Sequence, residues 1–329
     1  MRAILSVAGL LIMLLGGAAF YAIWLYDAPG PLPGPDVVLV PRGGLDQVAD
    51  ALVQEGVIRS AFALRTATIA TRGQGAVRAG ELEFPAAASL RQVLAVLRTA
   101  RPVQHRLTIP EGLTAVQVAL LIDRAPALDG DPAMPEEGHL LPETYAYERG
   151  TPRATLVERG RAAMDRALER SWAARNPAVP LDAATDALIL ASIVERETAK
   201  PEERPRIAAV FLNRLRRGMK LQSDATVVYG VSGGLGVLDH GLTRAELERD
   251  EPYNTYRIAG LPPGPISMPG LASLRAVTQP AQTDDLYFVA DGTGGHVFAR
   301  TAEEHQRNVA RWREIERARQ GVAPASAGR

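Results

Sequence analysis

Cysteine is absent from this chain, which excludes disulfide bonds and thiolate metal sites. An excess of basic charge is missing too: 37 basic side chains balance 37 acidic ones, which argues against a dedicated nucleic-acid-binding protein. The five histidines include no HExxH motif and no close pair, and no glycine-rich nucleotide-binding loop occurs. We therefore expect neither a metal nor a cofactor. The length of 329 residues and the 47% hydrophobic content indicate roughly two folded units.

Charge is also missing from one long segment near the amino terminus. No charged side chain occurs from Ala3 to Tyr26, and a helix of that length would cross a bilayer core of about 30 Å. Arg2 before the segment and Asp27 after it place the amino terminus in the cytoplasm by the positive-inside rule. A cleaved signal peptide is the alternative, but its apolar region would be shorter and would end in small residues rather than aromatic ones. We expect residues 1–27 to form a cytoplasmic tip and an uncleaved anchor in the cytoplasmic (inner) membrane, with everything after them extracytoplasmic.

A small domain is predicted after the anchor. Residues 28–36 are rich in proline and glycine, which predicts a semi-stiff linker. Residues 37–102 then read as a strand, a helix with apolar spacing, a second helix capped by Ser60, and a strand at 80–84. This order resembles a LysM-like glycan-binding module. The alternative is a spacer domain of the same α+β class.

A larger α+β domain is predicted over residues 103–320. Its closing helix, 301–320, opens with a capping-box pattern, and residues 321–329 are predicted to be a disordered tail. The helix at 182–198, with Asp182 as its expected cap, has apolar residues on more than one face, so it should be buried almost all round.

Two acids stand at the end of that helix, Glu195 and Glu197. Helical geometry separates them by about 200°. Glu197 continues an apolar stripe, whereas Glu195 continues a stripe of small residues. A carboxyl group in apolar surroundings has a raised pKa and can act as a general acid near neutral pH. The other interpretation is that both acids begin a solvated helix end, with Glu195 paired to a nearby arginine.

In segments later in the chain, tyrosine occurs close to amide and acidic side chains. Aromatic faces stack on sugar rings and amides bond to hydroxyl groups, so this composition suits a carbohydrate. Some of these residues are expected to hold loops rather than contact sugar. The candidates for substrate binding are Gln222, Asp224, Tyr229, Tyr253, Asn254 and Tyr256.

Three long segments carry a family resemblance. They are LASIVERETAKPEERPRIAAVFLNRLRRGMKLQSDATVVYG (190–230), YNTYRIAGLPPGPIS (253–267) and YFVADGTGGHVF (287–298). In this order they resemble the MltG-type, or YceG-like, endolytic murein transglycosylases. The resemblance covers about 103–320, and the family's anchor and LysM-like region match the first 100 residues. Glu143 is a departure, since the family usually has aspartate there, and His296 is interpreted as part of a loop rather than as a metal ligand.

The resemblance implies a bacterial inner-membrane enzyme, a carbon–oxygen lyase with a lysozyme-like active-site helix. It would cut the MurNAc–GlcNAc bond within nascent peptidoglycan strands, leave 1,6-anhydroMurNAc ends and so terminate glycan elongation. Glu197 would be the single general acid and base, because the wider lytic transglycosylases place a small hydroxyl residue after the catalytic glutamate and Thr198 stands there. Glu195 and Thr198 would support it.

The expected partners are glycan strands, the cytoplasmic membrane and, by family, peptidoglycan synthases. Two other functions stay open: a hydrolytic muramidase, and a non-catalytic glycan-binding scaffold of a cell-wall synthesis complex.

Overall fold

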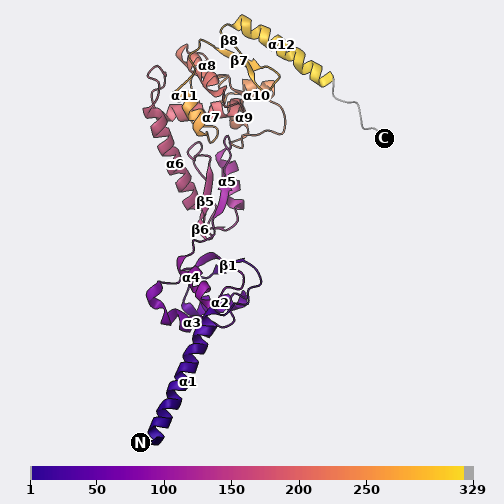
Figure 1. Ribbon diagram of the computed structural model, residues 1–329. Helices are drawn as coiled ribbons and strands as arrows, with labels where there is room; N and C mark the ends of the chain where they lie inside the picture. The colour runs from indigo at the N-terminus through magenta and orange to yellow at the C-terminus, as the bar shows by residue number, and fades with distance from the viewer. Residues whose placement is uncertain (1, 322–329) are drawn as a thin grey trace, which may run out of the picture. The chain divides into compact units, whose positions relative to one another are not determined.

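The structure is a computed structural model that describes residues 2–321, apart from the side chains of residues 2–8, 11, 320 and 321 (Figure 1). Its described part combines helices with short strands, which confirms the predicted α+β class. The chain divides into two compact units, one of Met1–His105 with Ala146–Thr151, the other of Arg106–Tyr145 with Pro152–Arg329. The predicted domain boundaries stay predictions. The predicted tail lies, beyond Gly321, outside the described residues.

The first unit packs helices around a two-stranded antiparallel sheet. Its elements are α1 (Arg2–Asp27), β1 (Asp36–Val40), α2 (Leu45–Gln54), α3 (Ala61–Ala70), a 3₁₀ turn (Arg72–Gln74), β2 (Gly80–Phe84) and α4 (Leu90–Thr99). The sheet aligns Val38 with Leu82, and both side chains are buried in the core of this unit. The hydroxyl of Ser60 accepts a hydrogen bond from the Ala63 amide, which confirms the predicted cap of α3. The predicted order of strand, helix, helix and strand is present, while likeness to a LysM module is not shown.

The segment predicted to be a membrane anchor is helical over α1. Near its carboxyl end, Arg91 of α4 forms an ion pair with Asp27 at 2.5 Å, and the Arg91 guanidinium lies 4.8 Å from the ring centroid of Tyr26. Within the described part of the chain, no helix combines the length and the apolar character that crossing a membrane requires. The predicted span includes residues 2–8 and 11, whose side chains lie outside the description.

The rest of the chain is mainly helical, with short strand pairs. Its elements are β3 (His105–Thr108), α5 (Ala115–Arg124), β4 (Leu128–Asp129), β5 (Thr144–Tyr147), β6 (Thr151–Pro152), α6 (Arg153–Ala173), α7 (Ala184–Glu197), α8 (Arg204–Arg216), α9 (Asp224–Val231), α10 (Arg244–Glu248), α11 (Leu271–Thr278), β7 (Tyr287–Ala290), β8 (His296–Ala299) and α12 (Ala302–Gly321). Strand β3 pairs with β5, β4 with β6, and β7 with β8.

Helix α7 is the central helix of the second unit. It packs against α6, α8, α9 and α11, and Figure 1 shows it among them. Leu190, Ile193 and Val194 are fully buried, so the prediction of a helix buried on nearly every side is confirmed. The predicted cap is wrong: the cap residue is Ala183, one residue after Asp182, and the carboxylate of Asp186 in the first turn accepts hydrogen bonds from the amides of Asp182 and Ala183.

Two further elements border the end of α7. The segment after residue 220 leads into α9, which packs against α7. Strands β7 and β8 form an antiparallel hairpin that aligns Ala290 with His296 and packs against α12. The site described next therefore draws on helix ends and loops that α7 holds in place.

Candidate active site

Glu197, the last residue of α7, keeps a reachable carboxyl group. Its Oε1 accepts a short hydrogen bond from the hydroxyl of Ser223. Burial raises the pKa of Glu197 and outweighs that hydrogen bond; the charge of Asp224 also raises it, while the charges of His296 and Arg214 act against the rise. The side chain lies deep in the unit yet keeps partial exposure. It can therefore hold a proton to a higher pH than an ordinary glutamate and still present it to a ligand.

Glu195 has the opposite surroundings. Its Oε1 lies 2.6 Å from Nη2 of Arg204, and its Oε2 accepts a hydrogen bond of 2.9 Å from the amide of Gly270. The Glu195 side chain is only 3% exposed. Burial raises its pKa, against the opposing effects of the Gly270 amide and Arg204. The pairing of Glu195 with an arginine is confirmed, but the solvated helix end predicted with it is wrong, because Glu195 is buried and protein groups occupy both of its oxygens.

The apolar-stripe argument predicted the more apolar neighbourhood for Glu197, and burial is the largest cause of its raised pKa. The smaller exposed fraction belongs to Glu195, whose carboxylate lies against Arg204 of α8 and the Gly270 amide at the start of α11.

A cavity of about 430 Å³ opens at the end of α7, within the range typical of small-ligand sites. Arg196 supports its wall, with its guanidinium donating to the backbone oxygens of Gly112 at 3.0 Å and Gly236 at 2.9 Å. The lining residues are Glu111, Gly112, Glu195, Arg196, Glu197, Thr198, Ala199 and Arg204. Both acids thus face the same cavity, and a third, Glu111, joins them.

Three of the predicted substrate-binding residues lie around Ser223. The hydroxyl of Tyr256 donates to Oδ1 of Asp224 at 2.6 Å, and the charge of Glu197 acts on Tyr256. Gln222 is exposed and adopts a left-handed backbone with φ of 53°, while its amide donates to the backbone oxygen of Thr255. That these three side chains contact a ligand stays a prediction.

The other three candidates divide into an aromatic pair and a loop support. The rings of Tyr229 and Tyr253 lie 4.8 Å apart, and the Tyr229 hydroxyl donates to Glu137 at 3.2 Å. Asn254 is buried, and its Nδ2 donates to the backbone oxygens of Leu247 and Arg249. Asn254 is therefore one of the residues that hold a loop. Among the described residues, no cluster of histidine and acidic side chains is arranged to hold a metal ion.

Sequence reasoning missed Ser223, Arg204 and Glu111. Ser223 stands between two named candidates, Gln222 and Asp224, so its position was a usable signal. Arg204 belongs to the next helix, and its pairing with Glu195 follows from packing that periodicity does not report. Glu111, whose carboxylate lies 3.2 Å from Arg204, lies between β3 and α5, where no candidate residue was predicted. The side chain of Glu143, the family departure, is exposed.

Fold and site together define an α+β protein whose cavity carries two acids at the end of one buried helix. The family model described as the YceG-like family matches residues 38–311, which is most of the chain. The chain therefore belongs to the YceG-like family.

Curated relatives and a solved structure agree with this membership. The chain is 33% identical over 255 residues to an endolytic murein transglycosylase of Streptococcus pneumoniae (strain D39 / NCTC 7466), a match that covers 64% of this chain and 45% of that protein. It is 42% identical over 120 residues to the one of Bacillus subtilis (strain 168), covering 36% and 32%. These matches span less than half the length of the curated relatives. A crystal structure of a yceG-like protein from Listeria monocytogenes superposes with a TM-score of 0.52 at 28% identity, over 84% of this chain and 99% of that one.

Proposed function

We propose that this chain is an endolytic murein transglycosylase that uses Glu197 as its single general acid and base. The observation that carries the proposal is the contrast at the end of α7. Glu195 is fixed between Arg204 and the Gly270 amide, whereas the contact of Glu197 is the neutral hydroxyl of Ser223. Within the described chain, no lysine, arginine or histidine forms an ion pair with Glu197. The names of the relatives support the same activity.

The proposed reaction needs one carboxyl group in two states. Protonated Glu197 donates its proton to the oxygen that links MurNAc C1 to GlcNAc, and the C1–O bond breaks. The Glu197 carboxylate then takes the proton of the MurNAc C6 hydroxyl while that oxygen bonds to C1, giving a 1,6-anhydro end. The proton taken restores the acid, so no water is consumed.

Ser223 has a defined place in this cycle. Its hydroxyl donates to Oε1, which leaves Oε2 of Glu197 to exchange the proton with the substrate. A hydrogen bond to the carboxylate favours the ionised form, so Ser223 offsets part of the desolvation that raises the pKa of Glu197. A group that must both give and take a proton works best with its pKa near the working pH.

A hydrolytic muramidase is the second candidate, and Glu111 is the observation in its favour. Hydrolysis of a glycoside normally needs two carboxylates, and Glu111 lines the same cavity with 42% of its side chain exposed. Digestion of purified glycan strands by the purified protein separates the candidates through product masses. The transglycosylase leaves 1,6-anhydro ends, a muramidase leaves reducing ends that are one water heavier, and a glycan-binding scaffold leaves the strands uncut.

The remaining parts of the proposal concern place and partners. The uncharged run from Ala3 to Tyr26 motivates an anchor in the cytoplasmic membrane, with the second unit outside the cytoplasm. Cell fractionation tests this: recovery of a processed, soluble protein would contradict it.

For the first unit we propose a LysM-like role in binding or positioning glycan, motivated by its strand–helix–helix–strand order. Deleting it should lower cutting of long strands more than of short ones. Peptidoglycan synthases as partners stay a prediction.

A further inference from the structure

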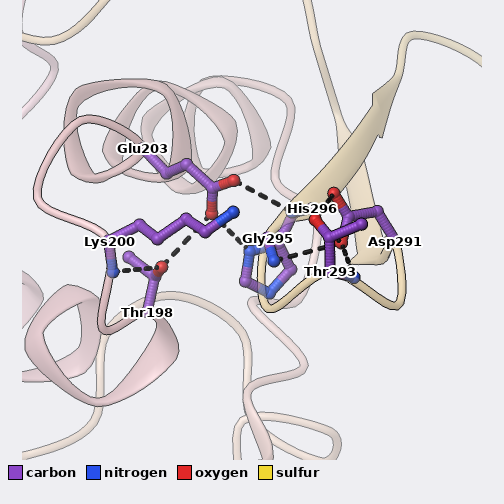
Figure 2. A network of polar contacts seen from close by, with 7 residues as sticks. All are labelled: Thr198, Lys200, Glu203, Asp291, Thr293, Gly295 and His296. Carbon is purple, nitrogen blue, oxygen red and sulfur yellow. Dashed lines mark hydrogen bonds and ion pairs between the residues drawn. The ribbon is translucent and has the colours of Figure 1, made fainter.

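Thr198, the residue after Glu197, is held in place by polar contacts of its hydroxyl group. Thr198 has an extended backbone and is 6% exposed. Its hydroxyl donates to Oε2 of Glu203 at 3.2 Å and accepts a hydrogen bond of 3.0 Å from the amide of Lys200. Figure 2 shows these contacts on the side of the loop that faces the β7–β8 hairpin. The turn that follows the proposed acid is thereby held through one side chain.

Glu203 is itself held by the hairpin. Its Oε1 accepts a hydrogen bond of 3.0 Å from the amide of His296, and its Oε2 lies 2.7 Å from Nδ1 of the same residue (Figure 2). Burial raises the pKa of Glu203, but the hydrogen bonds from His296 and Thr198 outweigh it, so the pKa is below its usual value. An ionised Glu203 requires a proton on Nδ1 of His296, which fixes the orientation of the ring.

The hairpin can approach this closely because position 295 is glycine. A Cβ atom on Gly295 would lie 2.5 Å from Oε1 of Glu203, 2.6 Å from Nζ of Lys200 and 3.2 Å from Oδ2 of Asp291. Asp291 fixes the turn by accepting hydrogen bonds from the amides of Thr293 and Gly295. The sequence GTGGH therefore allows the hairpin to approach the segment around Glu203, which lies about ninety residues earlier in the chain.

We propose that Glu203 and His296 are positioning residues for Glu197: through Thr198 they fix the turn that follows the proton donor. The inference rests on the proposed function, in which Glu197 is the acid and base. It assigns a role to the GGHVF segment, whose interpretation as a loop was wrong for His296, because that residue begins strand β8.

His296 also acts on Glu197 through its charge. Asp224, whose carboxylate bonds to the Tyr256 hydroxyl, raises the pKa of Glu197, and the charges of His296 and Arg214 lower it. Loss of the imidazole should therefore raise the pKa of Glu197 further.

Two substitutions at His296 separate positioning from charge. In His296→Asn, Nδ2 takes the place of Nδ1 and can still donate to Glu203, but the charge is lost. His296→Ala loses both. Thr198→Val removes the hydroxyl and leaves the charge of the imidazole in place. The matched control is His105→Gln, because His105 forms the same kind of pair with Glu81, through Nε2 at 2.5 Å, in the first unit.

The test combines two readouts on full-length protein checked for folding by thermal melting. The first is the titration of the Glu197 carboxyl carbon by NMR, assigned with Glu197→Gln. We expect the midpoint to move to higher pH in His296→Asn and to stay in place in His105→Gln.

The second readout is the rate of glycan cutting against pH. The limb where activity falls with rising pH should move upward in His296→Asn, because Glu197 must be protonated to begin. Thr198→Val and His296→Ala should lose roughly 10- to 100-fold at every pH.

The outcomes distinguish failure of this inference from failure of the proposed function on which it rests. If the wild-type protein cuts glycan, but His296→Asn moves neither the titration nor the pH limb and Thr198→Val cuts at the wild-type rate, the inference is overturned and the function stands. If no protein cuts glycan at any pH while the Glu197 titration still moves in His296→Asn, the function fails and the electrostatic coupling is retained.

Discussion

Glu195 and Glu197 lie two residues apart at the end of the same helix and line the same cavity, yet their partners come from different parts of the second unit. Arg204 of α8 and the Gly270 amide at the start of α11 occupy both oxygens of Glu195. The carboxylate of Glu197 instead accepts a hydrogen bond from the Ser223 hydroxyl, and the charges of Asp224, His296 and Arg214 act on its pKa. A carboxylate that is held by a fixed counter-charge has a structural role. A carboxyl group without that counter-charge can still exchange its proton with a ligand. The comparison teaches that burial alone does not identify a catalytic acid, because burial raises the pKa of both.

The largest expected effect on the structural side comes from removing Arg204. Its side chain is 8% exposed, and Arg204→Met would leave Glu195 buried without its cation. Breaking a buried pair on one side costs about 3–5 kcal/mol of unfolding free energy. Chemical denaturation would measure this loss. Arg161→Met, which removes an exposed pair with Glu158, is the control and should change the midpoint little. Equal losses in the two variants would remove the distinction between the two acids.

A smaller effect, on the catalytic side, is expected for Ser223→Ala. The hydroxyl favours the ionised form of Glu197, so its loss should raise the pKa of Glu197 further and move the alkaline limb of the rate profile to higher pH. The rate should fall about tenfold, since a hydrogen bond to a charged group contributes about 1.5 kcal/mol or more. Ser232→Ala, whose hydroxyl bonds to the backbone of Tyr229 and Gly236, should not move the limb. An unmoved limb in Ser223→Ala would mean that Ser223 does not act on the proton donor.

The smallest effect is a pH-dependent gain in stability for Glu197→Gln. Burial raises the folded-state pKa of Glu197 above its unfolded value, so the unfolded chain ionises first as pH rises. Stability from this group is complete below the unfolded pKa and is lost as pH rises through the folded one. The glutamine variant avoids this loss. Its melting temperature should exceed that of the wild type at neutral pH and converge with it in acid, as a series of thermal melts would show. A difference that persists unchanged in acid would contradict the assigned pKa direction.

Local pattern was enough for much of the fold. The apolar surface of α7, the Ser60 cap and the α+β class follow from spacing and capping rules that act within a few residues. The family and the importance of the segment around Glu197 followed from long motifs. The cap of α7 was placed one residue early: Ala183 is the cap residue, and the hydrogen bonds at this helix start come from the side chain of Asp186 rather than of Asp182.

The partners of the two acids could not be predicted in this way. Arg204 comes from the next helix, Ser223 from the loop before α9, and His296 from a hairpin far along the chain. Each contact depends on how helices and loops pack against one another. The spacing of residues within one segment does not predict that packing.

One measurement tests the central claim most directly. Glu197→Gln and Glu195→Gln would be confirmed as folded by thermal melting and digested side by side with purified glycan strands, and the products weighed by mass spectrometry. We expect Glu197→Gln to lose about 10²–10⁴-fold of the cutting that yields 1,6-anhydro ends, the typical cost of losing general acid–base catalysis. Glu195→Gln should still form those ends at a measurable rate. A folded Glu195→Gln with no activity, beside a Glu197→Gln that cuts at nearly the wild-type rate, would contradict the account and exchange the roles of the two acids.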